Sequence, residues 1–344
     1  MTKRAIFDGH NDLLTRLWMA DDRAGRGFFE GRDGHLDLAK MRAGGFAGGF
    51  FAVWCPGDPS DAPDPASPER AFKPIDTTAA RKVTLEQCAI LSRMARDWPE
   101  AIRVCTSVEE IASAEAVGAI AAILHIEGCE GISADLTELY VYHAAGLRSL
   151  GPVWSRSNIF GHGVPFRFAA SPDTGPGLTE AGERLVRECD RLGILVDLSH
   201  MNEAGFWDVA RVSARPLVAT HSAAHALCPS TRNLTDKQLD AIAERGGLVG
   251  LNFGVGFLRS DGVRNPDTGP EVMIRHLDHL LTKLGEEGVA LGSDFDGTTV
   301  PTFLDSAARL PRLTKAMETA GYGEALIQRI LWGNWMTVLG KVIG

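Results

Sequence analysis

Eight short apolar segments, most of them separated by helix-like segments, are the feature of this chain that most constrains its fold. Segments such as 246–253 are almost continuously apolar, as expected of parallel strands that are covered on both faces. The alternation of strands and helices predicts a parallel sheet of the α/β class, and eight repeats predict closure into a barrel. The eight segments are residues 4–8, 46–54, 120–127, 147–153, 193–200, 215–221, 246–253 and 288–294.

The length and composition fit one large domain. A chain of 344 residues with 44% hydrophobic content can bury a single extensive core, so we expect one domain over residues 1–344. Helical segments such as 84–94 and 179–189 place apolar residues at three- and four-residue intervals, which suits helices packed on a barrel wall.

The charge pattern argues against nucleic acid and membrane partners. The chain carries 35 basic and 44 acidic residues, a net charge of −9, and has no run rich in Lys or Arg. Asp8 interrupts the N-terminal apolar segment, and no stretch approaches the roughly 18 apolar residues of a membrane span. These features predict a cytoplasmic protein. The cysteines lack CxxC spacing and are expected to be free thiols: Cys55, Cys88, Cys105, Cys129, Cys189 and Cys228.

Residues 56–74 form one long segment rich in Pro, Asp and Ser. The segment follows the second predicted strand and would therefore lie over the rim of the barrel. A lid or a wall of the substrate site is one interpretation, and a disordered insertion is the other.

Potential metal ligands stand at or just after the ends of five predicted strands. In a parallel barrel the C-terminal strand ends form one rim, where catalytic sites are built from several strands at once. The two-residue period of a strand also places the first two of these ligands on one face. The sequence therefore predicts that six side chains meet: His10, Asp12, Glu127, His200, His221 and Asp294.

Imidazoles and carboxylates are the ligands that hydrolytic zinc sites use, and two such ions can share one bridging carboxylate. Glu127 lies centrally in the strand order and is the natural bridge. Asp294, on the last strand, is then available to accept a proton from water and to deliver it to the leaving amine.

Five sequence motifs resemble those of the membrane dipeptidase (renal dipeptidase) family, peptidase family M19 of the amidohydrolase superfamily. The resemblance covers nearly the whole chain, and the motifs occur in the family's order: DGHND (8–12), HIEG (125–128), DLSH (197–200), THS (220–222) and GSDFDG (292–297).

This resemblance implies a (β/α)8 TIM barrel with two Zn²⁺ ions per chain. His10 and Asp12 would hold one ion, His200 and His221 the other, and Glu127 would bridge them. Asp294 would serve the hydroxide between the metals. The implied reaction is hydrolysis of dipeptides, with tolerance for a D-residue at the C-terminal position.

The resemblance also implies substrate-binding positions. Arg232 matches the family's arginine for the substrate carboxylate, and a guanidinium can bind a carboxylate through two hydrogen bonds. Trp154 stands where the family usually has a histidine that polarises the scissile carbonyl. His162, Asn158 or Arg156 in the following loop could substitute for that histidine, or the substrate range could differ.

Three further residues are expected to support the site. Asp8 shares a strand face with His10 and is expected to orient a ligand imidazole. His125 points inward below the metals, either behind the ligands or in the core. Asp296 is expected to have a structural role in a turn.

Two other functions are weighed against a dipeptidase. The same metal site could serve an amidohydrolase that acts on a lactam, a cyclic amide or an N-acyl amino acid, although Arg232 favours substrates with a free carboxylate. A catalytically silent barrel used as a scaffold is the third option, and the complete set of ligands argues against it. The ligands also suit manganese or iron, and the oligomeric state, a homodimer included, stays open.

Overall fold

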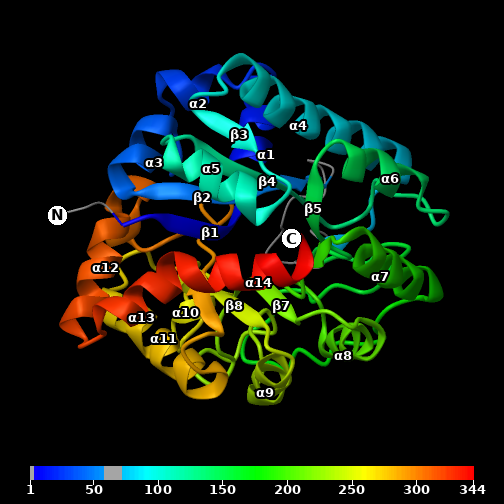
Figure 1. Ribbon diagram of the computed structural model, residues 1–344. Helices are drawn as coiled ribbons and strands as arrows, with labels where there is room; N and C mark the ends of the chain where they lie inside the picture. Colours follow the sequence, from blue (N-terminus) through cyan, green and yellow to red (C-terminus); the bar gives the residue numbers. More distant parts are fainter. Residues whose placement is uncertain (1–3, 58–71) are drawn as a thin grey trace.

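The structure is a computed structural model and describes residues 4–57 and 72–344 (Figure 1). Its strands are β1 (Ile6–Asn11), β2 (Phe46–Trp54), β3 (Ile102–Val104), β4 (Ile120–Glu127), β5 (Leu147–Gly151), β6 (Leu195–Val196), β7 (Val218–Ser222), β8 (Leu248–Leu251) and β9 (Val289–Leu291).

Helices connect the strands. They are α1 (Leu13–Met19), α2 (Arg26–Glu30), α3 (Leu38–Gly44), α4 (Thr77–Asp97), α5 (Val108–Ala116), α6 (Thr137–Ala144), α7 (Glu180–Leu192), α8 (Glu203–Val212), α9 (Asp236–Glu244), α10 (Val255–Leu258), α11 (Pro270–Leu284), α12 (Leu310–Thr319), α13 (Glu324–Gln328) and α14 (Asn334–Val342). None of the helices among the described residues is long and apolar enough to cross a membrane.

The strands form two parallel sheets. One has the order β1-β2-β4-β5-β6, with β3 paired to β4, and the other has the order β7-β8-β9. Parallel bridges from Asp197 to Val218 and from Asn11 to Phe295 link the two sheets at both edges. The alternating α/β pattern of the sequence is thus confirmed as parallel sheets surrounded by helices (Figure 1).

Several element boundaries differ from the prediction. The strand expected at 193–200 consists only of Leu195–Val196, because the chain turns at 197–200, where Asp197 Oδ1 accepts a hydrogen bond of 2.9 Å from Ser199 N. The short strand β3 was not expected, since its sequence IRV is no apolar run. The predicted helices 84–94 and 179–189 lie in α4 and α7, where Thr179 is the N-cap. Of segment 56–74, residues 58–71 lie outside the described part of the chain, so its predicted role stays a prediction.

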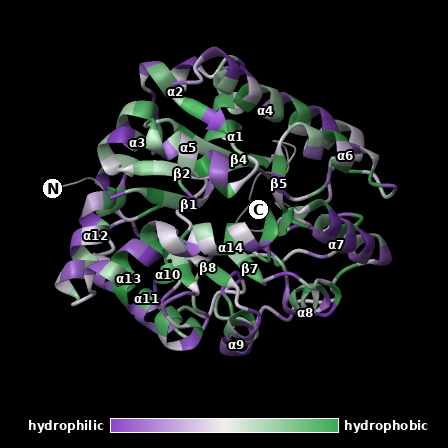
Figure 2. Cartoon of the chain, viewed as in Figure 1, coloured by the Kyte–Doolittle hydropathy of each residue, from purple (hydrophilic) through white to green (hydrophobic). Residues whose placement is uncertain are grey.

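Helix α14 packs against the beginnings of the strands. Trp335 and Leu339 belong to one buried cluster with strand residues that include Phe7, Val218 and Leu248. Figure 2 shows hydrophobic residues concentrated on the strands and hydrophilic residues on the outer helices. Because α14 covers the starting ends of the strands, the opposite, C-terminal ends remain available for a site.

Three glycines bring neighbouring strands unusually close to β7. Cβ atoms built on Gly9, Gly250 and Gly292 would lie 2.2, 2.1 and 2.0 Å from the carbonyl oxygen of Thr220. No side chain fits at these positions, so glycine is required for the packing of β1, β8 and the end of β9 around the residue that precedes His221.

We expect Gly250→Ala to destabilise the protein by roughly 1–3 kcal/mol, because the added methyl group must displace the Thr220 backbone. Gly340→Ala in α14 is the matched control, since its Cβ would meet nothing within 4 Å. The control should be neutral or stabilising by about 0.5–1 kcal/mol, as alanine favours helix. Chemical denaturation of both variants checks this, and equal stabilities would contradict the packing argument.

Candidate metal centre

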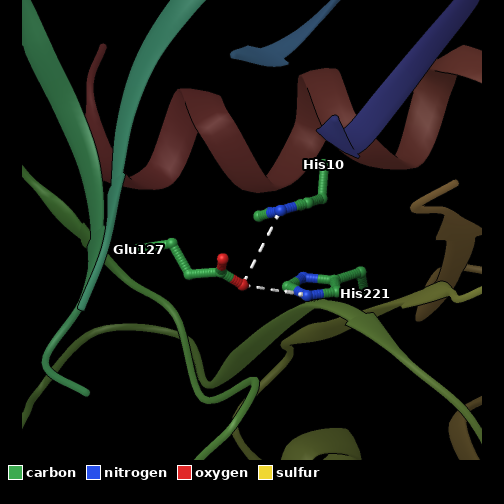
Figure 3. A group of neighbouring side chains, drawn as sticks. All are labelled: His10, Glu127 and His221. Atoms are coloured by element: carbon green, nitrogen blue, oxygen red, sulfur yellow. Dashed lines mark ion pairs between the residues drawn. The ribbon is translucent and has the colours of Figure 1, made fainter. Parts of the chain in front are cut away.

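Three of the six predicted side chains, all histidines, lie close to a carboxylate oxygen of a fourth, Glu127. The Nε2 atoms of His200, His221 and His10 lie 3.0, 3.3 and 3.7 Å from Glu127 Oε1. Glu127 ends β4, whereas His10 and His221 come from β1 and β7, so the side chains meet across the strand ends (Figure 3). All four are buried.

The other two predicted residues adjoin His10. His10, Asp12 and Asp294 each offer a ligand atom within 4.8 Å of the others, and His10, Glu127 and His221 form a second group of this kind. His10 Nε2 lies 3.4 Å from Asp12 Oδ2. All six residues named from the sequence are therefore brought together. Asp294, expected to transfer protons, also lies at ligating distance.

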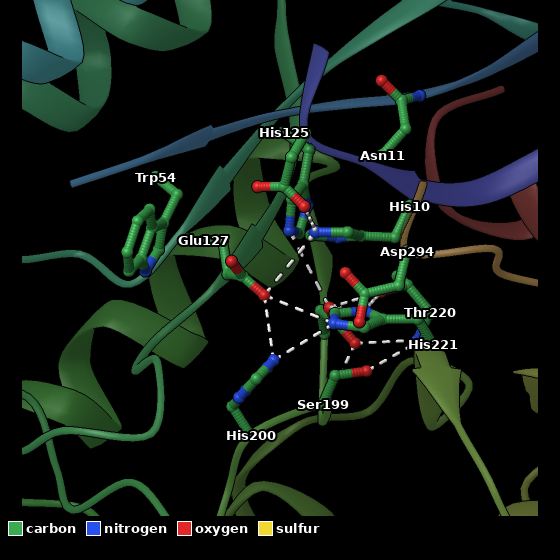
Figure 4. Close-up of polar contacts among 12 residues, drawn as sticks. His10, Asn11, Trp54, His125, Glu127, Ser199, His200, Thr220, His221 and Asp294 are labelled. Carbon is green, nitrogen blue, oxygen red and sulfur yellow. Dashed lines mark hydrogen bonds and ion pairs between the residues drawn. The ribbon is translucent and has the colours of Figure 1, made fainter. Parts of the chain in front are cut away.

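Several donor atoms of this cluster lack the partners that buried polar atoms require. Neither ring nitrogen of His10 has a hydrogen bond to any residue that the structure describes, and the same is true of Glu127 Oε1. His200 Nε2 and His221 Nε2 face each other at 3.1 Å (Figure 4). Buried polar groups are normally paired, so divalent cations between these atoms would supply what the protein itself does not. The donor set, imidazoles with carboxylates, fits zinc.

The electrostatics agree with this reading. Burial lowers the pKa of His200 and of His221 well below the usual value, and Arg232 and His10 lower them further, which leaves neutral imidazoles able to ligate. Burial also disfavours protonation of His10, but Glu127 and the other carboxylates outweigh it and raise the pKa to about 10. Burial raises the pKa of Glu127 to about 8 and that of Asp294 to about 6. The cluster thus brings several carboxylates together in a buried site, where bound cations would balance their charge.

Hydrogen bonds to the Nδ1 atoms orient the imidazole rings of His200 and His221. His200 Nδ1 pairs with Ser155 Oγ at 2.7 Å, and His221 Nδ1 pairs with Thr220 Oγ1 at 2.8 Å. Thr220 Oγ1 in turn donates to Asp197 Oδ2 at 2.6 Å. With each Nδ1 carrying the proton, each Nε2 is free to bind a metal, as is usual for histidine ligands.

Asp294 and His200 owe their positions to left-handed backbone conformations, with φ values of 58° and 66°. Asn252 donates to Asp294 Oδ2 at 2.9 Å, and Asp294 N donates to His10 O at 3.0 Å. Asn252 and Ser155 were not among the residues predicted to support the site. Asn252 directly follows the apolar strand β8, and a polar residue at a strand end is the same signal that pointed to the candidate ligands. No sequence pattern distinguishes Ser155.

The ligands open into a cavity of about 390 Å³, a size typical of small-molecule sites. Four aromatic side chains form much of its wall, and two arginines, Arg16 and Arg264, also line it. The residues around the cavity include Asp12, Trp54, Glu127, Trp154, Phe166, His200, Phe257, Asp294, Asp296 and Thr299.

The predicted substrate residues fall into two groups. Trp154 lines the cavity, 5.7 Å from the His200 ring between centroids. Arg232 is not among the lining residues and is only 3% exposed. Its Nη1 and Nη2 donate to Ser222 Oγ and His221 O, each at 2.8 Å, while Nε has no partner among the described residues. Arg232 therefore lies directly behind His221, one of the candidate metal ligands.

The three residues considered as substitutes for the family histidine are held away from the cavity lining. His162 Nδ1 pairs with Ser157 Oγ at 2.9 Å, and Asn158 Nδ2 donates to Pro152 O at 2.9 Å. Arg156 forms a buried ion pair of 2.7 Å with Glu130 and lies over the Trp154 ring. None of the three lines the cavity among the residues that the structure describes.

One expected supporting role is wrong. Asp8 does not hydrogen-bond the His10 ring; its carboxylate accepts from Ser293 N at 2.6 Å and Ser293 Oγ at 2.8 Å. Asp8 therefore fixes the segment that carries Asp294. His125 is buried behind the ligands, with Nδ1 2.8 Å from Ser149 Oγ.

The structural role expected for Asp296 is confirmed by its contacts. The carboxylate of Asp296 accepts from Arg32 Nη1 at 2.6 Å and from His35 N at 2.7 Å. These two contacts tie the turn after Asp294 to the segment between α2 and α3.

Comparisons with known proteins agree with this site. The chain matches the membrane dipeptidase family (peptidase family M19) over residues 1–343. An uncharacterized protein in the pqqA 5′ region of Klebsiella pneumoniae is 47% identical over 257 residues, 75% of this chain and 95% of the relative.

Two crystal structures are similar over 99% of both chains. One is a metallo peptidase from Rhodobacter sphaeroides liganded with a phosphinate mimic of the dipeptide L-Ala-D-Ala, with 49% identity and a TM-score of 0.94. The other is dipeptidase AC, a metallo peptidase of family M19, with 50% identity and a TM-score of 0.94. The chain therefore belongs to the membrane dipeptidase family and is a metallopeptidase of the dipeptidase type, as the sequence motifs predicted.

We expect Ser155→Ala to weaken metal binding by roughly 10- to 100-fold, because His200 loses the hydrogen bond that orients its ring. Ser157→Ala is the matched control, since Ser157 bonds His162, which does not line the cavity. Competition with a chelator measures the affinity of each variant. Equal affinities in the two variants would show that Ser155 does not position the ligand.

Proposed function

We propose that this chain is a zinc-dependent dipeptidase that hydrolyses free dipeptides and accepts a D-residue at the C-terminal position. The convergence of His10, His200 and His221 on Glu127 Oε1 is the observation that carries the proposal. The tolerance for a D-residue is supported by the Rhodobacter sphaeroides relative, whose ligand mimics L-Ala-D-Ala.

Two zinc ions would be held by residues of this rim. His10 and Asp12 would bind one ion, His200 and His221 the other, and Glu127 both. When bound, zinc ions polarise a carbonyl and lower the pKa of water to roughly 7, which provides a nucleophile at neutral pH. The chain contributes the positions of these ligands and a cavity of about 390 Å³ beside them.

Asp294 is the proposed proton carrier. It lines the cavity, is 9% exposed, and keeps its carboxylate fixed through Asn252. A carboxylate so placed can accept the proton of the attacking water and pass it to the departing amino group. Glu127 would thus hold the two ions, and Asp294 would transfer the proton.

Arg232 is proposed to recognise the free α-carboxylate of the substrate. Its guanidinium is buried beside His221, and its unpartnered Nε is a donor that an anion would satisfy. Trp154, which lines the cavity, would form an apolar wall against the substrate. A substrate that lacks the carboxylate should therefore bind poorly.

We also propose that the two sheets form one closed (β/α)8 barrel and a single domain. The bridges Asp197 to Val218 and Asn11 to Phe295 support closure, because they join the sheets at both edges in parallel orientation.

The proposed activity predicts selective cleavage of free dipeptides. With zinc, the protein should hydrolyse L-Ala-L-Ala and L-Ala-D-Ala, while C-terminally amidated dipeptides should react at least about 30-fold more slowly, because a lost charged contact costs about 2 kcal/mol or more. Chromatography of the released amino acids measures this. Faster cleavage of a lactam or an N-acyl amino acid would favour the general amidohydrolase instead.

The metal content gives a separate test. Elemental analysis should find close to two zinc ions per chain, and removal by a chelator should abolish hydrolysis, which readdition restores. One ion per chain after full supplementation would contradict the shared-ligand arrangement around Glu127.

Asp294→Asn should lower kcat by roughly 10²- to 10⁴-fold, the usual contribution of a general acid or base. The variant should keep both metals, because the side chain retains its size and its amide can still contact Asn252. Rapid kinetics and elemental analysis are read together. Loss of one metal from the variant would instead make Asp294 a ligand, as its distance from His10 and Asp12 allows.

A further inference from the structure

Two arginine side chains line the cavity, and they differ in their bonding. Arg16 Nε donates to Asp296 O at 2.6 Å. Arg264, in the segment between α10 and α11, is exposed and has no hydrogen bond or ion pair with any part of the chain that the structure describes. A cation that faces a substrate cavity without a protein partner is available to a substrate anion.

The segment that carries Arg264 is fixed in place. Thr302 N donates to Pro266 O at 2.8 Å, and Thr268 Oγ1 donates to Asn265 O at 2.6 Å. The stem of Arg264 packs on Gly256, where an added Cβ would lie 3.1 Å from Arg264 Cγ. The guanidinium is thus held at the cavity by its stem and its segment.

Two carboxylates have partners other than Arg264: Asp296, which lines the cavity, and Asp261, which lies three residues before Arg264 in the chain. Asp296 bonds Arg32 and His35 N, and Asp261 bonds Arg259 Nε at 2.9 Å. Among the described residues no carboxylate pairs with Arg264, so its guanidinium is free to meet an anion that enters the cavity.

Arg264 and Arg232 lie at different depths around one aromatic residue. Arg232 is buried, and its Cζ lies 5.9 Å from the centre of the Phe257 ring. Gly256, next in the chain to Phe257, contacts the stem of Arg264. The inner arginine therefore suits the α-carboxylate near the metals, and the outer one suits a group that extends from the same residue toward the mouth.

We propose that Arg264 binds an acidic side chain on the C-terminal residue of the dipeptide, so that substrates ending in Asp or Glu are preferred. The proposal rests on the proposed dipeptidase function and adds its substrate class. A dipeptide ending in Asp carries two carboxylates on one residue. Arg232, buried behind His221 with its Nε unpartnered among the described residues, is the proposed partner of the α-carboxylate, and Arg264, in the cavity lining, would take the side-chain carboxylate.

The test compares two nearly isosteric substrates, L-Ala-D-Asp and L-Ala-D-Asn, in the zinc-loaded enzyme. The wild type should favour the acidic substrate in kcat/KM by roughly 10-fold, mainly through KM, the size expected of a charged contact that is partly exposed to water. Arg264→Gln should reduce this ratio to within about twofold, and Arg264→Lys should keep part of it. Arg275→Gln, an exposed charge change on α11, is the control and should leave the ratio unchanged.

Two outcomes would overturn the proposal. One is an unchanged ratio in Arg264→Gln, whether or not both substrates react more slowly, and the other is a charge preference confined to the N-terminal position in Asp-Ala against Asn-Ala. Calorimetric titration of the same dipeptides measures the preference even without turnover. Failure of every dipeptide to react would count against the proposed function, whereas cleavage without acidic preference would count only against Arg264.

Discussion

The buried oxygen Oε1 of Glu127 is the point on which the rest of the site depends. Three imidazoles face it, and none of the described side chains satisfies it with a hydrogen bond. Such a cluster is costly in a low-dielectric interior unless cations occupy it. Metal binding and the stability of the rim are therefore coupled: the ions that provide the chemistry also balance the charges that the fold has brought together.

The strand packing serves the same centre. Gly9, Gly250 and Gly292 allow three segments to approach the carbonyl of Thr220, and the next residue is the ligand His221. Asp197 accepts from both Thr220 N and Thr220 Oγ1 and so fixes this position from the neighbouring strand. The position of an imidazole nitrogen is in this way set by backbone contacts, which vary less than side-chain rotamers.

The convergence of the six side chains could be predicted because it depends on local features: the period of two within a strand, the strand ends, and the common rim of parallel strands. His10 and Glu127 are examples. The partner of Asp8 could not be predicted, because Ser293 reaches it only through the contact of the first and last strands. The roles of Ser155 and Arg264 could not be predicted for a related reason. Each lies in a loop whose path is set by tertiary contacts rather than by any periodic pattern.

The aromatic wall separates two kinds of positive charge. Arg156 stacks on Trp154 and Trp54, but the buried ion pair with Glu130 neutralises its charge. It can therefore make the wall rigid without attracting an anion. Arg264 has no such partner in residues 4–57 and 72–344, so its charge can act on a group that enters the cavity. Burial with a carboxylate makes one arginine structural, and exposure without one makes the other suited to recognition.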